Sequence, residues 1–175
     1  MIFLSAGHHP SKPGACFGSF CEHDEAVIWA QAIAKALEGE ASFVPPGVLK
    51  EKVAYINSRA PTLAVEIHFN SAVVNGEHVG KGCETLYYPG SHLGKALAKE
   101  IQTRLAEVYP PDRGVKEGYY RMDPKRGPDF FLAKTKCPSV IVEPEFIHRK
   151  EIIQEKRDEG IAAIAGGILA YLGEQ

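Results

Sequence analysis

Apolar and polar residues alternate along the chain in blocks that predict strands and helices in turn. The apolar runs MIFLSA at residues 1–6, LAVEI at 63–67 and PSVIV at 138–142 predict strands. Residues 23–37 place apolar side chains at helical spacing, which predicts a helix between the first two strands. Its apolar positions are Ala26, Trp29, Ala30, Ile33 and Leu37. The order strand, helix, strand is typical of an α/β domain.

Three further segments have helical periodicity. Leu49, Val53 and Ile56 predict a second helix, and two longer stripes predict a third helix after CETLYY and a last helix at the end of the chain. The stripe of the third helix is Leu93, Leu97, Ile101, Leu105 and Val108, and that of the last helix is Ile161, Ile164, Ala165, Ile168 and Leu172. Residues 110–128 are rich in Pro, Gly, Arg and Tyr and predict a loop.

These elements predict one α/β domain over residues 1–175, with a mostly parallel twisted sheet flanked by helices. The uninterrupted apolar run PSVIV is typical of a strand buried on both faces of a parallel sheet. A chain of 175 residues with 45% hydrophobic residues can bury a sizeable core without a disulfide or a structural metal. Any metal is therefore available for chemistry.

Charge and hydropathy argue against two classes of partner. With 20 basic and 22 acidic residues, the chain has no basic excess for binding nucleic acid or an anionic membrane. The apolar segment GIAAIAGGILAYLG at 160–173 is shorter than the roughly 20 residues that span a bilayer, so it predicts a buried terminal helix. The N-terminus lacks a basic leader, and we therefore expect synthesis in the cytoplasm without a signal peptide.

The four cysteines form no CxxC pair, which excludes a zinc ribbon and a thioredoxin-like motif. They are Cys16, Cys21, Cys83 and Cys137. We expect mainly reduced, partly buried thiols, as in an intracellular protein. Cys16 and Cys21 lie in one Gly-rich loop and can pair if they are oxidised.

Three of the predicted strands are followed by ionisable side chains. His8 and His68 come after the first two strands, and Glu143 comes after PSVIV. A histidine after a single strand is commonly a surface or core residue. If the strands are parallel neighbours, however, all three side chains meet beyond the carboxyl ends of the strands, where sites of open α/β sheets gather. Two imidazoles and a carboxylate match the ligands of catalytic zinc, which keeps a fourth position open for water.

Besides the two histidines, a third protein ligand is needed, and the start of the first helix offers three candidates for it. Glu22, Asp24 and Glu25 follow the loop PSKPGACFGSFC, which is long enough to fold back over the strand ends. Acids in a first helical turn also complement the helix dipole without any further role. The residues alone leave this choice open.

Six segments, in this order, carry a resemblance that covers nearly the whole chain: SAGHHPSKPGA, EHDEAVIWAQAIAKAL, EIHFNS, GCETLYY, LGKALAKEI and PSVIVEPEFI. Together they resemble the zinc-dependent N-acetylmuramoyl-L-alanine amidases of the amidase_3 type, found in bacterial cell-wall hydrolases and phage endolysins. The resemblance implies a phosphorylase/hydrolase-like α/β fold, one Zn²⁺ per chain and peptidoglycan as the substrate. It also implies a single catalytic domain, and the chain leaves no room for a separate cell-wall-binding domain.

Position by position, the resemblance makes His8, Glu22 and His68 the zinc ligands and Glu143 the catalytic carboxylate. The activity implied is hydrolysis of the amide between N-acetylmuramic acid and L-alanine, by a metal-activated water with a glutamate base. Two alternatives are a zinc peptidase that cuts within the stem peptide and a catalytically silent wall-binding module. A protein made in the cytoplasm would act on the wall after its release.

The chain departs from the family pattern at two points. Gly7-His8-His9-Pro10 stands where relatives have Gly-His-Gly-Gly, so His9 is an alternative ligand, although His8 keeps the family spacing. In VEPEF, Glu145 stands where a glycine is common and competes with Glu143, because alternation places both on one side of an extended segment. Spacing favours Glu143.

Supporting groups are less constrained. Glu66 and Asn70 are near enough in sequence to accept a hydrogen bond from the free ring nitrogen of His68. Six side chains of the segment 110–128 are suited to holding the carboxylates of a stem peptide and its sugar, unless the segment is a solvated, mobile loop. They are Arg113, Tyr119, Tyr120, Arg121, Lys125 and Arg126.

Overall fold

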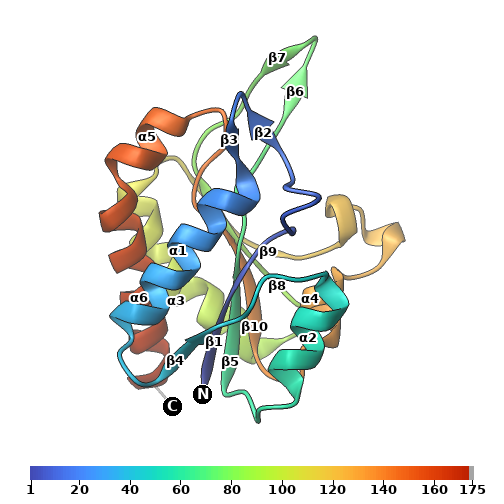
Figure 1. Cartoon of the computed structure of the whole chain (residues 1–175), viewed down its shortest axis with the longest axis vertical. Coiled ribbons are helices and arrows are strands. Elements are labelled where there is room, and N and C mark those ends of the chain that lie inside the picture. The colour runs from blue at the N-terminus through green and yellow to red at the C-terminus, as the bar shows by residue number, and fades with distance from the viewer. Residues whose placement is uncertain (174–175) are drawn as a thin grey trace.

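The fold is built on a six-stranded sheet with strand order β4-β1-β5-β10-β8-β9, which runs through the middle of Figure 1. The structure is a computed structural model that describes residues 1–173. The strands of this sheet are β1 (Ile2–Ala6), β4 (Ala41–Phe43), β5 (Leu63–Ile67), β8 (Cys83–Tyr87), β9 (Asp112–Glu117) and β10 (Ser139–Glu143).

Four neighbouring strands of the sheet, β4, β1, β5 and β10, are parallel. β8 runs antiparallel to β10, and β9 runs parallel to β8. The expected mostly parallel α/β sheet is thus confirmed. The three central strands β1, β5 and β10 end side by side at one edge of the sheet, and this edge positions the site.

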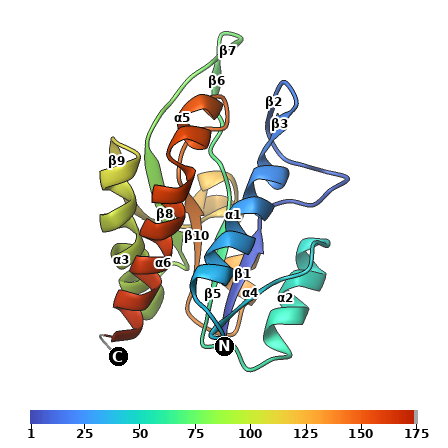
Figure 2. The same cartoon turned by 60° about the vertical axis from the view of Figure 1, so that its left-hand side comes forward.

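Helices cover both faces of the sheet (Figures 1 and 2). On one face lie α1 (Glu22–Ala36), α3 (His92–Val108), α5 (Lys150–Glu155) and α6 (Arg157–Gly173). On the other face lie α2 (Leu49–Asn57) and α4 (Phe130–Lys134). The helices predicted from periodicity are confirmed, and no helix within residues 1–173 combines the length and the apolar character needed to cross a membrane.

Two hydrophobic cores fill the spaces between the sheet and its helices. Leu4, Val65 and Val140 point toward α1, α3 and α6, and their neighbours along the strands point toward α2 and α4. Those neighbours are Phe3, Ala64 and Ile141. Because successive side chains of a strand alternate between its faces, apolar residues at almost every position are required to fill both cores. Ser5 and Glu66 are two polar residues on the α2 side, and both are buried.

The sequence predicted a loop for residues 110–128, but this segment also contains regular structure. It contains β9, which pairs with β8 only and lies at the edge of the sheet. Its sequence DRGVKE is polar and half-exposed, so it lacks the hydrophobic pattern of a buried strand. After β9 come two 3-10 turns, η1 (Tyr120–Met122) and η2 (Pro124–Arg126).

Two small hairpins project beyond the end of the sheet, at the top of Figure 1. One is formed by β2 (Cys16–Phe17) and β3 (Phe20–Cys21), the other by β6 (Val73–Val74) and β7 (Glu77–His78). In the first hairpin Cys16 and Cys21 are cross-strand neighbours joined by a disulfide. The expectation of mainly reduced thiols is therefore wrong for this pair, because the hairpin brings the two residues opposite each other. Cys83 and Cys137 are free, buried and half-buried respectively.

Candidate active site

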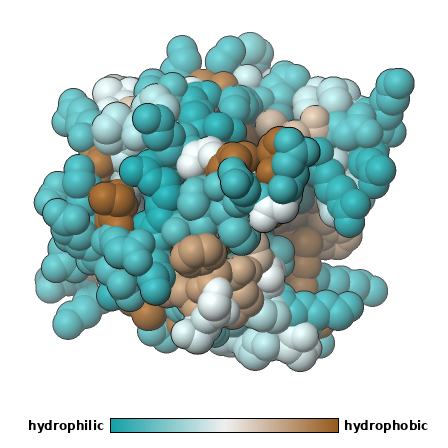
Figure 3. Space-filling view, turned by 90° about the horizontal axis from the view of Figure 1, so that it is seen from above, coloured by the Kyte–Doolittle hydropathy of each residue, from teal (hydrophilic) through white to brown (hydrophobic). Residues whose placement is uncertain are grey.

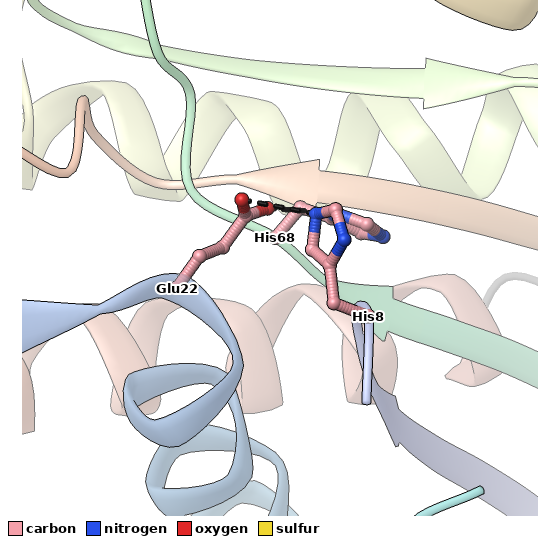
Figure 4. A group of neighbouring side chains, drawn as sticks. All are labelled: His8, Glu22 and His68. Atoms are coloured by element: carbon pink, nitrogen blue, oxygen red, sulfur yellow. Dashed lines mark hydrogen bonds and ion pairs between the residues drawn. The ribbon is translucent and has the colours of Figure 1, made fainter. Parts of the chain in front are cut away.

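His8 and His68 lie at the ends of the neighbouring strands β1 and β5. The backbone N–H of Gly7 donates to the carbonyl of Ile67 at 2.7 Å, so the ladder between the strands continues up to His8. The N–H of His68 donates to the carbonyl of Val142 at 2.9 Å, which ties it to β10. As Figure 4 shows, the two imidazoles point toward the same place, with ring centroids 5.0 Å apart.

Glu22, the first residue of α1, places its carboxylate beside the rings of both histidines (Figure 4). Oε1 lies 2.8 Å from His68 Nδ1, and Oε2 lies 3.0 Å from His8 Nε2. The carboxylate also accepts the backbone N–H groups of Phe69 and Ala15, each at 3.1 Å. Glu22 is 4% exposed, so these contacts fix its side chain in one orientation.

The pKa values of this cluster follow from its charges. Burial alone would raise the pKa of Glu22, but the hydrogen bonds and charges of His68 and His8 outweigh burial and lower this pKa to about 2. Burial alone would lower the pKa of His68, but the carboxylates of Glu22 and Glu66 raise it well above the ordinary value. The Glu22 carboxylate is therefore ionised at neutral pH, and it favours a positive charge beside it, either a proton on the imidazole or a metal ion.

Two glycines make room for the cluster. A Cβ atom on Gly7 would lie 2.5 Å from Cε1 of His68. A Cβ atom on Gly14 would lie 2.5 Å from Glu22 Oε2, and Gly14 also has a φ of +80°, which disfavours other residues. The backbone around the cluster is therefore built for close approach.

The three side chains fit a zinc ion. His8, Glu22 and His68 each offer one ligand atom, and these atoms all lie within 4.8 Å of one another. Two imidazole nitrogens and one carboxylate oxygen are donors of catalytic zinc sites, whereas structural zinc is commonly closed by four protein ligands. The His8 side chain is 36% exposed, so the cluster is accessible from solvent on that side.

The alternative ligands lie elsewhere. The ring of His9 contacts Ser11, at 3.3 Å from the hydroxyl. Asp24 is exposed on α1, and the buried Glu25 carboxylate forms an ion pair with Arg157 at 2.7 Å. Of the acids at the start of α1, the structure brings only Glu22 to the histidines.

Glu143 and Glu145 have different surroundings. The Glu145 carboxylate accepts the backbone N–H groups of Gly82 and Phe146, each at 2.8 Å, and pairs with Arg149 at 2.7 Å. Among residues 1–173, by contrast, no side chain or backbone group forms a hydrogen bond or ion pair with the Glu143 carboxylate. Glu145 thus holds the chain after β10, whereas the Glu143 carboxylate has no such partner within the described residues.

Glu143 is held in an environment that favours its protonated form. Burial raises the pKa of its carboxyl group to about 7, and the negative charges of Glu84 and Glu22 add to this effect against the positive charges of His68 and Arg113. Glu84 lies directly opposite Glu143 in the antiparallel pair of β8 and β10. A carboxyl group with a pKa near neutrality is suited to both accepting and donating a proton.

Two cavities meet at His68. One of about 280 Å³ is lined by His8, His9, Lys12, Leu49, Lys52, Glu66, His68, Tyr120 and Asp129. The other, of about 150 Å³, is lined by His68, Leu86, Tyr119, Arg121, Met122, Asp129, Ile141 and Glu143. The larger cavity adjoins His8 and the smaller one adjoins Glu143. The segment that contains η1 lies over both cavities through Tyr120 and Arg121.

Not all the polar residues of segment 110–128 reach these cavities. Tyr119, Tyr120 and Arg121 line them, but Arg113 pairs with Glu84 at 3.2 Å, and Lys125 and Arg126 are exposed. A larger cavity, of about 680 Å³, lies between the start of α3 and the segment before β10, and neither His8 nor His68 lines it. Figure 3 views the end of the molecule at which β1, β5 and β10 terminate, and its surface is mainly hydrophilic, with hydrophobic side chains in a few separate groups.

Sequence reasoning missed Lys52 entirely. Its ammonium group forms an ion pair with Glu66 at 2.7 Å beneath the histidines, and Lys52 is 2% exposed. Asn70, one of two suggested partners of His68, instead donates to Glu84 at 2.5 Å. Glu66, the other, lies 3.2 Å from His68 Nε2.

A mixed sheet with helices on both faces and a His, Glu, His cluster beyond its parallel strands defines a hydrolase-like α/β protein with a candidate metal site. The model of the family described as N-acetylmuramoyl-L-alanine amidase, Amidase_3, matches residues 2–170. The chain therefore belongs to this amidase family, as its sequence motifs indicated. No curated protein sequence matches the chain.

Solved structures of this family have the same fold. The chain is similar to an N-acetylmuramoyl-L-alanine amidase from Clostridium difficile 630, with 23% identity and a TM-score of 0.83 over 99% of this chain and 97% of that chain. For amidase AmiC2 of Nostoc punctiforme the identity is 24% and the TM-score 0.81, with the same coverage. For the catalytic domain of the CD27L endolysin, which targets Clostridia difficile, the identity is 26% and the TM-score 0.72, over 97% of this chain and 96% of that chain.

Proposed function

We propose that the protein hydrolyses the amide bond between N-acetylmuramic acid and L-alanine in peptidoglycan, with zinc as its cofactor. The observation that carries this proposal is the convergence of His8, Glu22 and His68, whose ligand atoms lie within 4.8 Å of one another. Membership of the amidase family supports the substrate. The mainly hydrophilic surface around the site suits a polar polymer (Figure 3).

His8, Glu22 and His68 would hold one zinc ion through two imidazole nitrogens and a carboxylate oxygen. When bound, zinc supplies a Lewis acid that polarises the amide carbonyl and lowers the pKa of water from about 15.7 toward 7. The low pKa of Glu22, about 2, keeps this ligand ionised at any physiological pH. The accessible side of His8 leaves space from which a substrate carbonyl can approach.

Glu143 would serve as the general base and then as the general acid. It accepts a proton from the attacking water and donates it to the L-alanine nitrogen as the carbon–nitrogen bond breaks. Proton transfer by a positioned side chain contributes about 10²- to 10⁴-fold to a rate. Glu143 lines a cavity together with His68 and has no competing hydrogen bond among residues 1–173, both of which support this role.

The two cavities that meet at His68 would receive the two sides of the scissile bond. Tyr120 in the larger cavity offers a ring for packing against a sugar, and Arg121 in the smaller one offers a cation for a stem-peptide carboxylate. Both come from the segment over the site.

Mass spectrometry of digested peptidoglycan tests the activity directly. Purified cell walls are incubated with the zinc-loaded protein and, in parallel, with the Glu143→Gln variant. We expect release of stem peptides with a free L-alanine amino terminus from the wild type, and a strongly reduced yield from the variant. Cleavage inside the stem peptide would instead assign a zinc peptidase. The absence of products from the zinc-loaded wild type would assign a wall-binding module.

A further inference from the structure

Lys52 and Glu66 form a buried ion pair directly beneath the proposed ligands, at 2.7 Å between Nζ and Oε1. Each residue is 2% exposed, although they come from different elements, α2 and β5. Neither belongs to the set of three ligands. Such a pair has two explanations, a contribution to the stability of the fold or a role in the site.

Glu66 contacts the His68 ring on the side away from the proposed metal. Its Oε2 atom lies 3.2 Å from His68 Nε2, whereas His68 Nδ1 lies 2.8 Å from Glu22. The two nitrogens of this imidazole therefore face two different carboxylates. Glu66 is itself fixed, because its Oε1 atom accepts from Lys52 and from the hydroxyl of Ser5 at 3.2 Å.

Lys52 contacts the backbone that carries the other histidine. Its ammonium group donates to the carbonyl of Ala6 at 2.5 Å, and the carbonyl of His8 lies at 3.4 Å. His8 has a φ of 57°, a left-handed conformation that non-glycine residues adopt only where their surroundings hold it. Through these contacts, one ion pair connects the ring of His68 to the turn of His8.

The two explanations differ in the expected size of the effect on stability and on metal affinity. A buried ion pair commonly adds little stability over apolar residues of similar volume, because the cost of removing both charges from water offsets their attraction. A carboxylate on the second nitrogen of a metal-binding histidine, in contrast, is commonly worth about 10- to 100-fold in metal affinity or activity. The contacts of this pair are thus better explained by the site than by the core.

We propose that Lys52 and Glu66 are positioning residues of the metal site. Glu66 accepts the Nε2 proton of His68 and so presents Nδ1 to the metal, while Lys52 orients Glu66 and holds the strand end from which His8 projects. This inference rests on the proposed function, since it concerns the affinity of the same three ligands for zinc. It adds two residues that are not among the three proposed metal ligands.

The double variant Lys52→Met/Glu66→Met tests the pair without leaving an unpaired buried charge. We expect the metal-free variant to fold with a melting temperature within a few degrees of the wild type, because similar replacements are often neutral or stabilising. Its dissociation constant for zinc, measured by competition with a chromophoric chelator, should rise about 10- to 100-fold. A folded double variant with the wild-type dissociation constant would overturn the proposal.

A matched control removes another buried ion pair outside the site. Glu25 pairs with Arg157 at 2.7 Å and is also 2% exposed, but it does not contact either histidine. The variant Glu25→Met/Arg157→Met should keep the wild-type affinity for zinc whatever its stability. An equal loss of zinc affinity in this control would show a general effect of altered packing and would also overturn the proposal.

A second measurement uses the wild-type chain and so does not depend on a variant that folds. The protein is labelled with ¹⁵N-histidine and loaded with ¹¹³Cd²⁺ as a substitute for zinc. We expect a cadmium coupling to Nδ1 of His68 and a protonated Nε2. Coupling to Nε2 would overturn the positioning proposal and leave the metal site intact, whereas a wild-type protein that binds neither zinc nor cadmium would contradict the proposed function itself.

Discussion

The imidazoles of His8 and His68 lie with their ring centroids 5.0 Å apart, each just beyond the end of one of two neighbouring parallel strands. The Glu22 carboxylate contacts both rings from the start of α1. Since parallel strands end at the same edge of a sheet, their register places the two rings together and the first helix then adds the acid. The positions of the proposed metal ligands and of Glu143 thus follow from the order of β1, β5 and β10 in the sheet.

Substitution of either proposed histidine ligand should remove zinc and activity together. In His8→Ala and His68→Ala, the site keeps only two of three protein ligands, so metal content per chain should fall along with amide hydrolysis. Metal analysis by mass spectrometry after desalting measures the first, and release of stem peptides measures the second. His9→Ala is the matched control and should retain both, since the ring of His9 contacts Ser11 instead. Full zinc occupancy in His8→Ala with loss in His9→Ala would reverse this assignment.

Glu143→Gln and Glu145→Gln should separate catalysis from stability. Glu143→Gln should bind zinc normally and lose about 10²- to 10⁴-fold in turnover, because a general base is removed. Glu145→Gln should remain active but unfold more easily, by about 1–3 kcal/mol, since two backbone N–H groups and Arg149 lose a charged acceptor. Steady-state rates and urea unfolding measure the two effects. An active Glu143→Gln beside an inactive Glu145→Gln would exchange the two roles.

The raised pKa of Glu143 predicts how the stability of the metal-free protein depends on pH. The pKa is 4.5 as the ordinary value and about 7 in the folded protein. Between these values the unfolded chain ionises this group while the folded chain keeps it protonated, so stability is lost as pH rises from about 4.5 to 7. The Glu143→Gln variant has no ionisable group at this position, so its stability does not fall for this reason.

In the presence of a chelator, the Glu143→Gln variant should therefore gain stability relative to the wild type as pH rises, by at most about 3 kcal/mol at pH 8. Urea unfolding of both proteins at pH 5 and pH 8 measures the difference, and comparing them cancels the other titrating groups. A difference that stays constant over this range would mean that Glu143 has an ordinary pKa.

Reduction of the Cys16–Cys21 disulfide should lower the stability of the protein. The bond closes a short loop, with a sequence separation of 5. In the sequence, this loop lies between His8 and Glu22. Chain entropy assigns a bond across such a loop about 2 kcal/mol. Thermal melts with and without a phosphine reductant measure the effect, and the Cys16→Ser/Cys21→Ser variant should be insensitive to the reductant. A wild type that melts identically under both conditions contradicts this expectation.

Sequence pattern predicts the centre of this fold well because its strands are apolar throughout. MIFLSA, LAVEI and PSVIV have no other stable location than between two helical layers, and their common direction brings His8, His68 and Glu143 to one edge. The outermost strands of the sheet are harder to predict. β9 is polar because it is half-exposed and pairs on one side only, so the same residues also suit a loop.

The contacts that distinguish alternatives depend on long-range geometry. Alternation gives Glu143 and Glu145 the same side of an extended chain, and only the backbone N–H groups that surround Glu145 separate them. Lys52 lies on the same helical face as Leu49 and Ile56, but a lysine is usually solvated, and its burial depends on Glu66 in the facing strand β5. Likewise, Cys16 and Cys21 pair because a hairpin forms between them.

The position of the metal in crystals of the zinc-loaded protein shows directly whether His8, Glu22 and His68 form the proposed zinc site. Anomalous diffraction measured at the zinc absorption edge locates the ion without assumptions about activity. We expect one peak per chain, within bonding distance of His8 Nε2, the Glu22 carboxylate and His68 Nδ1. A peak bound elsewhere, or no peak at these three side chains at full zinc loading, would contradict the proposed zinc site.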